Sequence, residues 1–312
     1  MLEIKKYNSS NKDEWNKFIV SSRQGTFLLN RNYMDYHADR FADHSLMIYK
    51  GSKLLALLPA NYEGSTLYSH QGLTYGGLIT NTKATVETVC EAFTAINSYL
   101  AANGFNHVIY KAIPYIYHLL PADEDLYALT NVCHARLTVR HISSTILPGI
   151  SPAFAESRKS GLRKALRNNI TVGTSNRLDL FWNILNNNLQ HKYGARPVHS
   201  LAELQLLQSR FPDNIKLYMA WKGNEALGGT LIFETPQVIH TQYISASPEG
   251  KASGCLDILF NWLINEKYRN CKYFDFGKSS VGNGRELNQP LIFQKEGFGG
   301  RGVCYDWYEW DI

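Results

Sequence analysis

The order of the predicted elements constrains the fold of this chain most, because the same series occurs twice. The first half reads as two helices, the antiparallel strands SLMIYK and KLLALL, a periodic helix over 85–104 and a buried strand over 106–113. The second half reads as helices over 151–169, 177–193 and 200–212, three antiparallel strands over 215–247, a helix over 255–270 and a strand over 271–277. This mixture of helices and antiparallel strands is typical of the α+β class. We predict two tandem α+β domains, 1–148 and 149–312, divided near LPGISP.

Composition agrees with two soluble domains. The chain has 312 residues, of which 44% are hydrophobic and 19% are charged, as in ordinary globular proteins. Apolar runs such as LLALLPA are too short to span a bilayer, and the N-terminal MLEIKKYNSS has no apolar signal core. The five cysteines are dispersed without a C-x-x-C pair, so we expect a reduced, cytoplasmic protein with no metal site.

Three glycine motifs near the C-terminus suggest nucleotide binding at first sight. FDFGKSS contains the end of a phosphate loop and a kinase-like DFG, and EGFGGRG contains a G-x-G-x-x-G at Gly297, Gly299 and Gly302. A phosphate loop requires glycine at 272, where this chain has Lys272. The kinase partner motifs are missing, and a strand pattern follows Gly302 where a dinucleotide site requires a helix. None of the three motifs therefore predicts nucleotide binding.

The same glycines fit a ligand cleft at the ends of consecutive strands. A strand ending in Gly-Lys-Ser-Ser turns away from its neighbour, which makes Lys278 and Ser279 candidate cofactor contacts. Upstream, a strand enters SPEGKASG and then a helix, and helix-start amides after a glycine turn favour anions. Each stretch taken alone is also consistent with an ordinary turn. The second one supplies four further candidate cofactor contacts: Gly250, Lys251, Ala252 and Gly254.

A basic segment lies at the start of the second half. In SPAFAESRKSGLRKALRNN, Lys159, Arg163 and Arg167 recur every fourth residue, so a helix places them on one face. This face is either simply solvated or contacts an anion such as a cofactor pyrophosphate, tRNA or a lipid head group.

The strand, the SPEGKASG loop, the helix and the strand ending at DFG resemble the acyl-CoA-binding core of GNAT N-acyltransferases. Gly250 and Ala252 match the last elements of the loop motif of that superfamily, whereas Ser247 stands where Gln or Arg is usual. The resemblance implies two GNAT-like domains, each a mixed, mostly antiparallel twisted sheet flanked by helices. It also implies acyl-CoA as a co-substrate.

A longer resemblance, to FemAB-like transferases, covers nearly the whole chain. It rests on TFLLNRNYMDYHADRF, SHQGLTYGG, HKYGARPVHS, HTQYISAS, YFDFGKSS and FQKEGFGGR. Lys295 to Phe298 resemble the F-K-x-G-F signature of that family, with Gln294 in place of its first Phe. Members transfer aminoacyl groups from tRNA, or other acyl groups, to amines of cell-envelope precursors. No charged heptad stretch for a helical arm is present, which argues against tRNA as a partner. The chain most resembles the arm-less members associated with surface-polysaccharide synthesis, and this association is implied by the resemblance alone.

N-acyl transfer requires a positioned amine, a route for its proton and donors for the developing oxyanion. We select Asp275 as the base or amine-orienting group, Lys295 as the partner of the carbonyl or anion, and Tyr243 as a further catalytic candidate. Strict strand alternation places His240 and Gln242 on one face, as substrate contacts, and Tyr243 on the other. Asp275, Lys295 and His240 also fit structural roles, as a cap, a surface lysine and a core histidine.

Further substrate contacts are expected in two loops. His191, Tyr193 and Arg196 in HKYGARPVHS form either a lid that reads a phosphate or carboxylate, or an ordinary helix stop. In the first half, His70 and Tyr75 within SHQGLTYGG are candidate acceptor contacts.

The sequence thus predicts an enzyme that moves an acyl group from an acyl-CoA-type thioester to an amine of an envelope or polysaccharide precursor. The alternatives are a transferase that depends on aminoacyl-tRNA, and a catalytically silent GNAT fold that serves as a binding or scaffold protein. The identities of donor and acceptor, the half that binds the donor, and the oligomeric state are left open.

Overall fold

The computed structural model describes residues 2–312, apart from the side chains of Lys192 and Tyr193. The chain forms two compact units. Unit 1 contains Met1–His141, Val281–Glu286 and Cys304–Ile312, and unit 2 contains Ile142–Ser280 and Leu287–Val303.

Unit 1 is built around two sheets, ordered β1-β3-β4-β7 and β17-β8-β6-β5-β2. Strand β9 ends in unit 2, and β17 begins there. The strands are β1 (Leu2–Lys6), β2 (Ala42–Asp43), β3 (Leu46–Lys50), β4 (Lys53–Leu58), β5 (Asn61–Glu63), β6 (Thr66–Tyr68), β7 (Ile79–Thr80), β8 (His107–Lys111), β9 (Arg136–Ile146) and β17 (Arg301–Asp311). The helices are α1 (Lys12–Ser21), α2 (Arg31–Met34), α3 (Val86–Ala102) and α4 (Glu124–Asn131), with 3₁₀ turns at Ser9–Asn11, Phe27–Leu29, Asp35–His37 and Tyr115–Tyr117.

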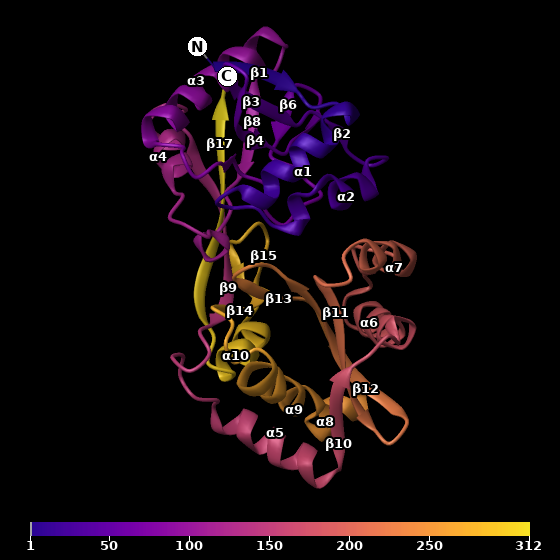
Figure 1. Ribbon diagram of the computed structural model, residues 1–312. Helices are drawn as coiled ribbons and strands as arrows, with labels where there is room; N and C mark the ends of the chain where they lie inside the picture. The colour runs from indigo at the N-terminus through magenta and orange to yellow at the C-terminus, as the bar shows by residue number, and fades with distance from the viewer. Residues whose placement is uncertain (1) are drawn as a thin grey trace. The chain divides into compact units, whose positions relative to one another are not determined.

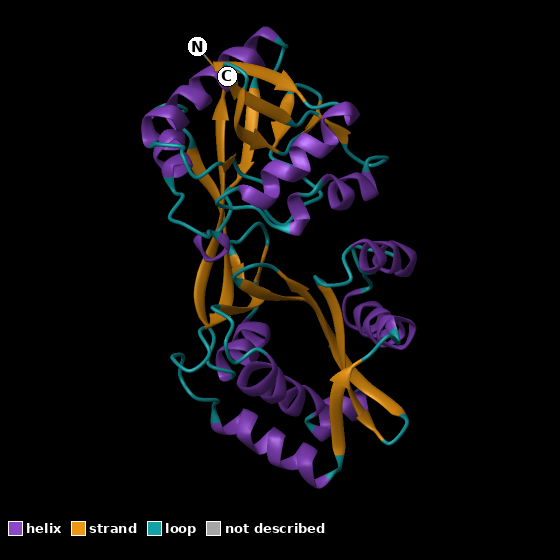
Figure 2. Cartoon of the chain, in the orientation of Figure 1, coloured by secondary structure: helices purple, strands orange, loops and turns teal. Residues whose placement is uncertain are grey.

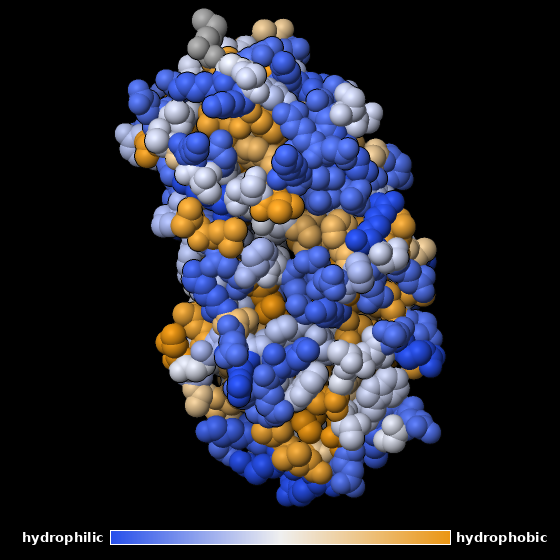
Figure 3. Space-filling model, viewed as in Figure 1, coloured by the Kyte–Doolittle hydropathy of each residue, from blue (hydrophilic) through white to orange (hydrophobic). Residues whose placement is uncertain are grey.

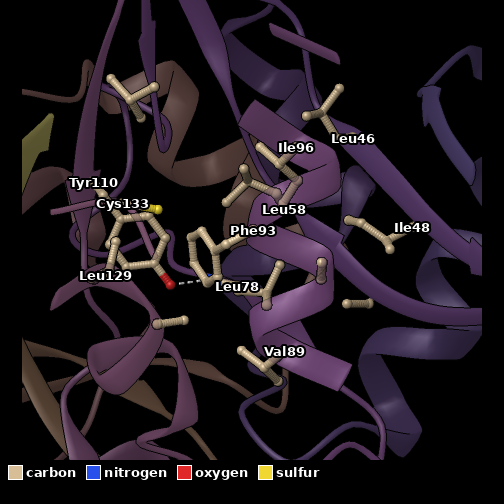
Figure 4. Packing of buried hydrophobic residues seen from close by; sticks show 14 of the residues in the cluster. Leu46, Ile48, Leu58, Leu78, Val89, Phe93, Ile96, Tyr110, Leu129 and Cys133 are labelled. Carbon is tan, nitrogen blue, oxygen red and sulfur yellow. Dashed lines mark hydrogen bonds between the residues drawn. The ribbon is translucent and has the colours of Figure 1, made fainter. Parts of the chain in front are cut away.

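Helix α3 supplies the centre of the unit 1 core. Thr85 and Thr88 form a capping box at its start, and Gly104, at φ +80°, follows its end. Figure 4 shows the buried side of α3, where Phe93 and Ile96 pack among leucines of the sheet. Apolar residues at helical spacing are thus removed from water on one face of α3.

Unit 2 has one sheet in the order β10-β11-β12-β13-β14-β9. Its strands are β10 (Ile170–Thr174), β11 (Ile215–Lys222), β12 (Glu225–Glu234), β13 (Val238–Ala246) and β14 (Tyr273–Lys278). Its helices are α5 (Glu156–Arg167), α6 (Leu178–Tyr193), α7 (Leu201–Arg210), α8 (Pro248–Ser253), α9 (Cys255–Trp262), which continues as a π turn over Leu263–Lys267, and α10 (Gln289–Gly297). Two short strands, β15 (Ser280–Val281) and β16 (Glu286–Leu287), pair with each other. Figure 1 shows α6 and α7 on one side of β11–β13, with α8 and α9 on the other.

Aromatic side chains dominate the core of unit 2 on the α9 side of the sheet. Phe260 of α9 makes edge contacts with Phe274 and Phe276 of β14, at ring-centroid distances of 6.2 and 5.0 Å. Phe298, just after α10, stacks on Phe276 at 5.6 Å. These rings hold α9, β14 and the end of α10 together.

The α+β fold class is confirmed, and most predicted elements are present (Figure 2). The units differ from the predicted 1–148 and 149–312 in that unit 2 already begins at Ile142, while residues 304–312 complete unit 1. The end of β9 pairs with β14, and β17 pairs with β8. Strands β9 and β17 each have residues in both units. The two units therefore cannot be separated by cutting the sequence at one position.

Candidate active site

The candidate site of unit 2 begins where two parallel strands separate. Strands β13 and β14 pair only over Val238–His240 and Tyr273–Asp275. Beyond these residues β13 continues to Ala246, while β14 ends at Lys278. Backbone groups at such an opening are released from the ladder and can approach a ligand.

A β-bulge in β13 changes which side chains share a face. Tyr243 pairs with Leu231 and Thr241 pairs with Ile232, so Gln242 is the extra residue. The predicted alternation, with His240 and Gln242 together and Tyr243 opposite, is therefore wrong. His240 pairs with Phe233 and Tyr243 pairs with Leu231. Because these partners are two residues apart on β12, His240 and Tyr243 lie on the same face, although three positions separate them along β13.

Asp275 is the centre of a buried hydrogen-bond cluster on that face. Its carboxylate is fully buried and accepts hydrogen bonds from the hydroxyls of Ser143 and Thr145, the latter at 2.8 Å, and from His240 Nδ1 at 2.7 Å. Burial alone would raise the pKa of Asp275. The hydrogen bonds and charge of His240, together with the two hydroxyls, outweigh burial and lower this pKa. Asp275 is thus held as a carboxylate that orients His240.

His240 presents its other ring nitrogen away from this carboxylate. The ring is only partly buried, with 13% of its side chain exposed, and Nε2 is free to accept a proton once Nδ1 donates to Asp275. Gly277 makes this position possible. It adopts φ +70°, and a Cβ there would lie 3.0 Å from His240 Cε1, so glycine both permits the turn and leaves room for the ring.

Lys295 lies at the same strand end, on α10. Its Nζ donates to the carbonyls of Gly277 and Lys278, both at 2.8 Å, and its side chain is buried. An ammonium has three donors, so one N–H remains beyond these two bonds. Burial lowers the pKa of Lys295 to about 8, although Asp275 acts in the opposite direction. The pKa of Lys278 is also lowered to about 8 by burial.

A pocket of about 200 Å³ opens beside Lys295. It is bounded by α6, the end of β13, the α8–α9 segment, β14 and α10. Phe260, Phe276 and Phe298 form part of its apolar wall, and Lys251 and Lys295 are its charged lining residues. The pocket is therefore an apolar space with a buried ammonium in its wall.

The predicted cofactor loop is itself helical. Gly250, Lys251 and Ala252 belong to α8, and Gly254, at φ +80°, joins α8 to α9. The Gly250 amide donates to the Ser247 hydroxyl at 3.0 Å, and the Lys251 amide donates to the Ser247 carbonyl at 2.9 Å. These two amides are thus used within the chain.

The two glycines of this segment have packing roles. A Cβ on Gly250 would lie 2.2 Å from the Leu227 carbonyl oxygen, and one on Gly254 would lie 2.3 Å from that of Gly161. Lys251 reaches the pocket with its side chain, where Nζ donates to Asn188 Oδ1 at 2.8 Å. Of the four predicted loop contacts, Lys251 lines the pocket, and Gly250, Ala252 and Gly254 do not.

Tyr243 has a partner that the sequence interpretation missed. Its hydroxyl lies 2.7 Å from Nδ1 of His199, a buried residue within the predicted lid. Burial raises the pKa of Tyr243, so this residue is a neutral hydroxyl at physiological pH.

Ser279, a predicted cofactor contact, is buried, and its hydroxyl lacks a hydrogen-bond partner in the described part of the chain.

The remaining predicted lid residues lie at the end of α6. Gly194 ends α6 in the left-handed conformation, at φ +59°, as in an ordinary helix stop. His191 and Arg196 are exposed, and His191 Nδ1 lies 2.7 Å from the carbonyl of Asn187 in the same helix. The side chain of Tyr193 lies outside the described residues.

Unit 1 has a parallel strand pair of the same kind, and its own chain covers the strand ends. Strands β6 and β8 pair in parallel over Thr66–Tyr68 and His107–Ile109. Lys111 Nζ then donates to the carbonyls of His70, Gln71 and Leu73 at 3.0 to 3.2 Å. The predicted acceptor contacts His70 and Tyr75 are both buried in this segment. Tyr75 shares a hydrogen bond of 3.0 Å with Thr26.

The basic helix α5 keeps part of its charge in solvent. Arg158 forms an ion pair with Asp257 at 2.9 Å, and Arg163 forms one with Glu156 at 2.5 Å. Lys159, Lys164 and Arg167 are exposed.

On the viewed face of the molecule, Figure 3 shows hydrophilic residues interrupted by separate apolar patches.

Within residues 2–312, no helix combines the length and the apolar character that crossing a bilayer requires. The described residues also contain no group of three or more His, Cys, Asp or Glu side chains placed to hold a metal ion.

Two α+β units, each with a parallel strand pair followed by diverging chains, define a tandem GNAT-like fold. No protein-family model and no curated protein matches the sequence. Among solved structures, FemX is similar over 97% of this chain and 96% of its own, with a TM-score of 0.65 and 11% identity. L-PGS from Bacillus licheniformis is similar over 96% of this chain and 91% of its own, with a TM-score of 0.60 and 12% identity. A tandem GNAT protein from the clavulanic acid biosynthesis pathway is similar over 100% and 98%, with a TM-score of 0.52 and 10% identity. At these identities the likeness establishes the fold.

Proposed function

We propose that unit 2 is an N-acyltransferase that moves an acyl group from a thioester of the acyl-CoA type to an amine. The observation that carries this proposal is the placement of the Asp275–His240 pair and of Lys295 at one strand opening. The tandem GNAT-like fold, shared with FemX and L-PGS, supports the same class of reaction. As in the members that the sequence resembles, the acceptor we propose is an amine of a cell-envelope or polysaccharide precursor.

His240 is the proton acceptor in this mechanism. Asp275 accepts a hydrogen bond from Nδ1–H, which leaves Nε2 to take the proton that the amine loses as it attacks the carbonyl. Such general-base assistance contributes about 10²–10⁴-fold to a rate. Asp275 is a positioning residue, because its oxygens are occupied by His240, Ser143 and Thr145.

Lys295 supports the negative charge that develops on the carbonyl oxygen. Its two bonds to Gly277 and Lys278 fix the ammonium, and its third N–H is left for the oxyanion. As the amine attacks, the carbonyl π electrons move to oxygen. They return when the carbon–sulfur bond breaks, and the thiolate leaves.

The donor belongs to unit 2 in this proposal. The pocket opens at the strand ends of unit 2, whereas the corresponding strand ends of unit 1 are covered by residues held on Lys111. For a CoA donor, the Lys251 side chain is the cationic group at the pocket that can meet a phosphate, since the Gly250 and Lys251 amides are bonded to Ser247.

Thermal unfolding of the whole chain with CoA, acetyl-CoA and aminoacyl-tRNA, measured in parallel, tests the donor class. A ligand present at about 100 times its dissociation constant stabilises the fold by roughly 2.7 kcal/mol. Stabilisation by the CoA esters supports the proposal. Stabilisation by aminoacyl-tRNA alone would replace the thioester with the tRNA donor. No stabilisation by any of the three would favour a scaffold role.

A further inference from the structure

The lining of the unit 2 pocket carries information about the acyl group itself. Its walls are mostly apolar, with phenylalanines from α9, β14 and the end of α10, and leucines from α6, α9 and α10. Its volume is about 200 Å³, somewhat more than the roughly 150 Å³ of an apolar protein cavity that accommodates benzene. An apolar group of that size would fill the space and exclude water from it.

The charged residues that line the pocket are all cationic. Lys251 and Lys295 line the pocket, and none of the lining residues from the described part of the chain is Asp or Glu. With Lys251 assigned to a phosphate of the donor, an acyl group with an ammonium at its α-carbon would bring a further cation beside Lys295, without a carboxylate in the lining to pair with it. Removing an unpaired charge from water is strongly unfavourable, and so is placing like charges close together.

The two buried carboxylates among the described residues of unit 2, Asp257 and Asp275, cannot serve as that partner. Asp257 forms an ion pair with Arg158 at 2.9 Å. Asp275 is fully buried, and its oxygens already accept from His240, Ser143 and Thr145. It lies on the face of β14 that carries the polar cluster, whereas Phe274 and Phe276, the neighbouring residues of this strand, belong to the apolar core.

We infer that the acyl group transferred by unit 2 is uncharged and apolar, with about four to seven carbons, and that the pocket rejects aminoacyl groups. This inference rests on the proposed function and names its substrate class. Each methylene that enters the apolar space is expected to tighten binding by about fourfold.

Three CoA esters with one carbon skeleton test the charge preference directly. Calorimetry on the full chain would compare 4-methylpentanoyl-CoA, 2-hydroxy-4-methylpentanoyl-CoA and leucyl-CoA, which differ by H, OH or NH₃⁺ at the α-carbon. Acetyl-CoA gives the baseline. We expect 4-methylpentanoyl-CoA to bind at least tenfold more tightly than acetyl-CoA and than leucyl-CoA, with the hydroxy ester between them. Equal or tighter binding of leucyl-CoA would overturn the inference.

Two variants and a control locate the effect. Leu291→Trp narrows the pocket from α10 and should remove the advantage of 4-methylpentanoyl-CoA over acetyl-CoA. Phe293→Trp on the same helix is the control, because Phe293 is 69% exposed and does not line the pocket. Leu189→Glu adds a carboxylate to the wall and should shift the preference toward leucyl-CoA by at least tenfold. Unchanged selectivity in both Leu291→Trp and Leu189→Glu would show that the acyl group binds elsewhere.

These measurements separate the inference from the proposed function. Ester binding needs no acceptor, so a leucyl preference refutes the inference while the proposed catalytic groups remain. Conversely, absence of acyl transfer to any amine refutes the proposed function, and a His240→Gln variant that transfers at the wild-type rate refutes the proposed role of His240. Neither result changes the binding selectivity, because His240 does not line the pocket. Failure of every CoA ester to bind, with binding of leucyl-tRNA, overturns both the inference and the thioester donor.

Discussion

His240 Nδ1 lies 2.7 Å from Asp275 Oδ2, although 35 residues separate them along the chain. Strands β13 and β14 bring them together, because His240 and Asp275 are the last residues of the parallel ladder. The pair is thus fixed by backbone pairing immediately before the strands diverge. Side chains at such a position are held rigidly and still border an open space, which suits an acid–base pair.

Replacing His240 with Gln should slow acyl transfer by about 10²–10⁴-fold, because the proposed proton acceptor is lost while the side chain keeps a similar size. Asp275→Asn should also lower the rate, because an amide at this position no longer favours the His240 tautomer with the proton on Nδ1. Transfer rates and circular dichroism of both variants would check this. Unfolding of Asp275→Asn would leave His240→Gln as the decisive variant, and a wild-type rate in a folded His240→Gln would contradict the assignment.

Sequence reasoning selected Asp275 and His240 from strand patterns and Lys295 from a family signature, and the structure places all three at one strand opening. Their catalytic roles stay predictions. Sequence reasoning missed the helix that carries Lys295, since residues 289–297 combine one proline with a low apolar periodicity. It also missed Ser143 and Thr145, which lie 132 and 130 residues from Asp275. Pairing of β14 with β9 brings these hydroxyls to the carboxylate. The spacing of residues within a short stretch of sequence cannot predict a contact between segments so far apart.

The bulge at Gln242 shows a second limit of sequence patterns. Strict alternation is a sound rule for a regular strand, but a single inserted residue reverses it. The bulge changes the candidate site, because Tyr243 joins the face of His240 and reaches His199.

The rate advantage that we propose for Lys295 should disappear at high pH. Its folded-state pKa is about 8, so the ammonium is present below pH 8 and is lost as the pH rises through that value. The ratio of the wild-type rate to that of Lys295→Met should therefore be about 10²–10³ at pH 7 and should approach one well above pH 8. A ratio cancels the ionisation of the acceptor amine. Lys278→Met is the matched control. Lys278 also has a pKa of about 8, but its side chain has no role in the proposed mechanism, so this variant should keep the wild-type pH dependence.

Gly277→Ala should reduce both stability and activity. Alanine at φ +70° costs about 1–2 kcal/mol of backbone strain, and its Cβ would lie 3.0 Å from His240 Cε1. Gly223→Ala is the control, because Gly223 has φ +57° with no atom within 4 Å of its Cβ position. Chemical denaturation should show a similar loss for both variants, whereas the transfer rate should fall in Gly277→Ala alone. Equal rates in the two variants would argue against a close contact between Gly277 and His240 in the active enzyme.

Lys111→Met tests whether unit 1 contributes only structure. Lys111 Nζ holds three backbone carbonyls of residues 70–73, and losing a buried donor should lower the free energy of unfolding by about 2–4 kcal/mol. Donor binding to the folded variant should stay at the wild-type level, because the proposed donor pocket is formed by unit 2 residues. Denaturation curves and calorimetry with a CoA ester, at a temperature where the variant is folded, would measure both quantities. Lys53→Met, at an exposed lysine of β4, should change neither. Loss of CoA ester binding in folded Lys111→Met would place part of the donor site in unit 1.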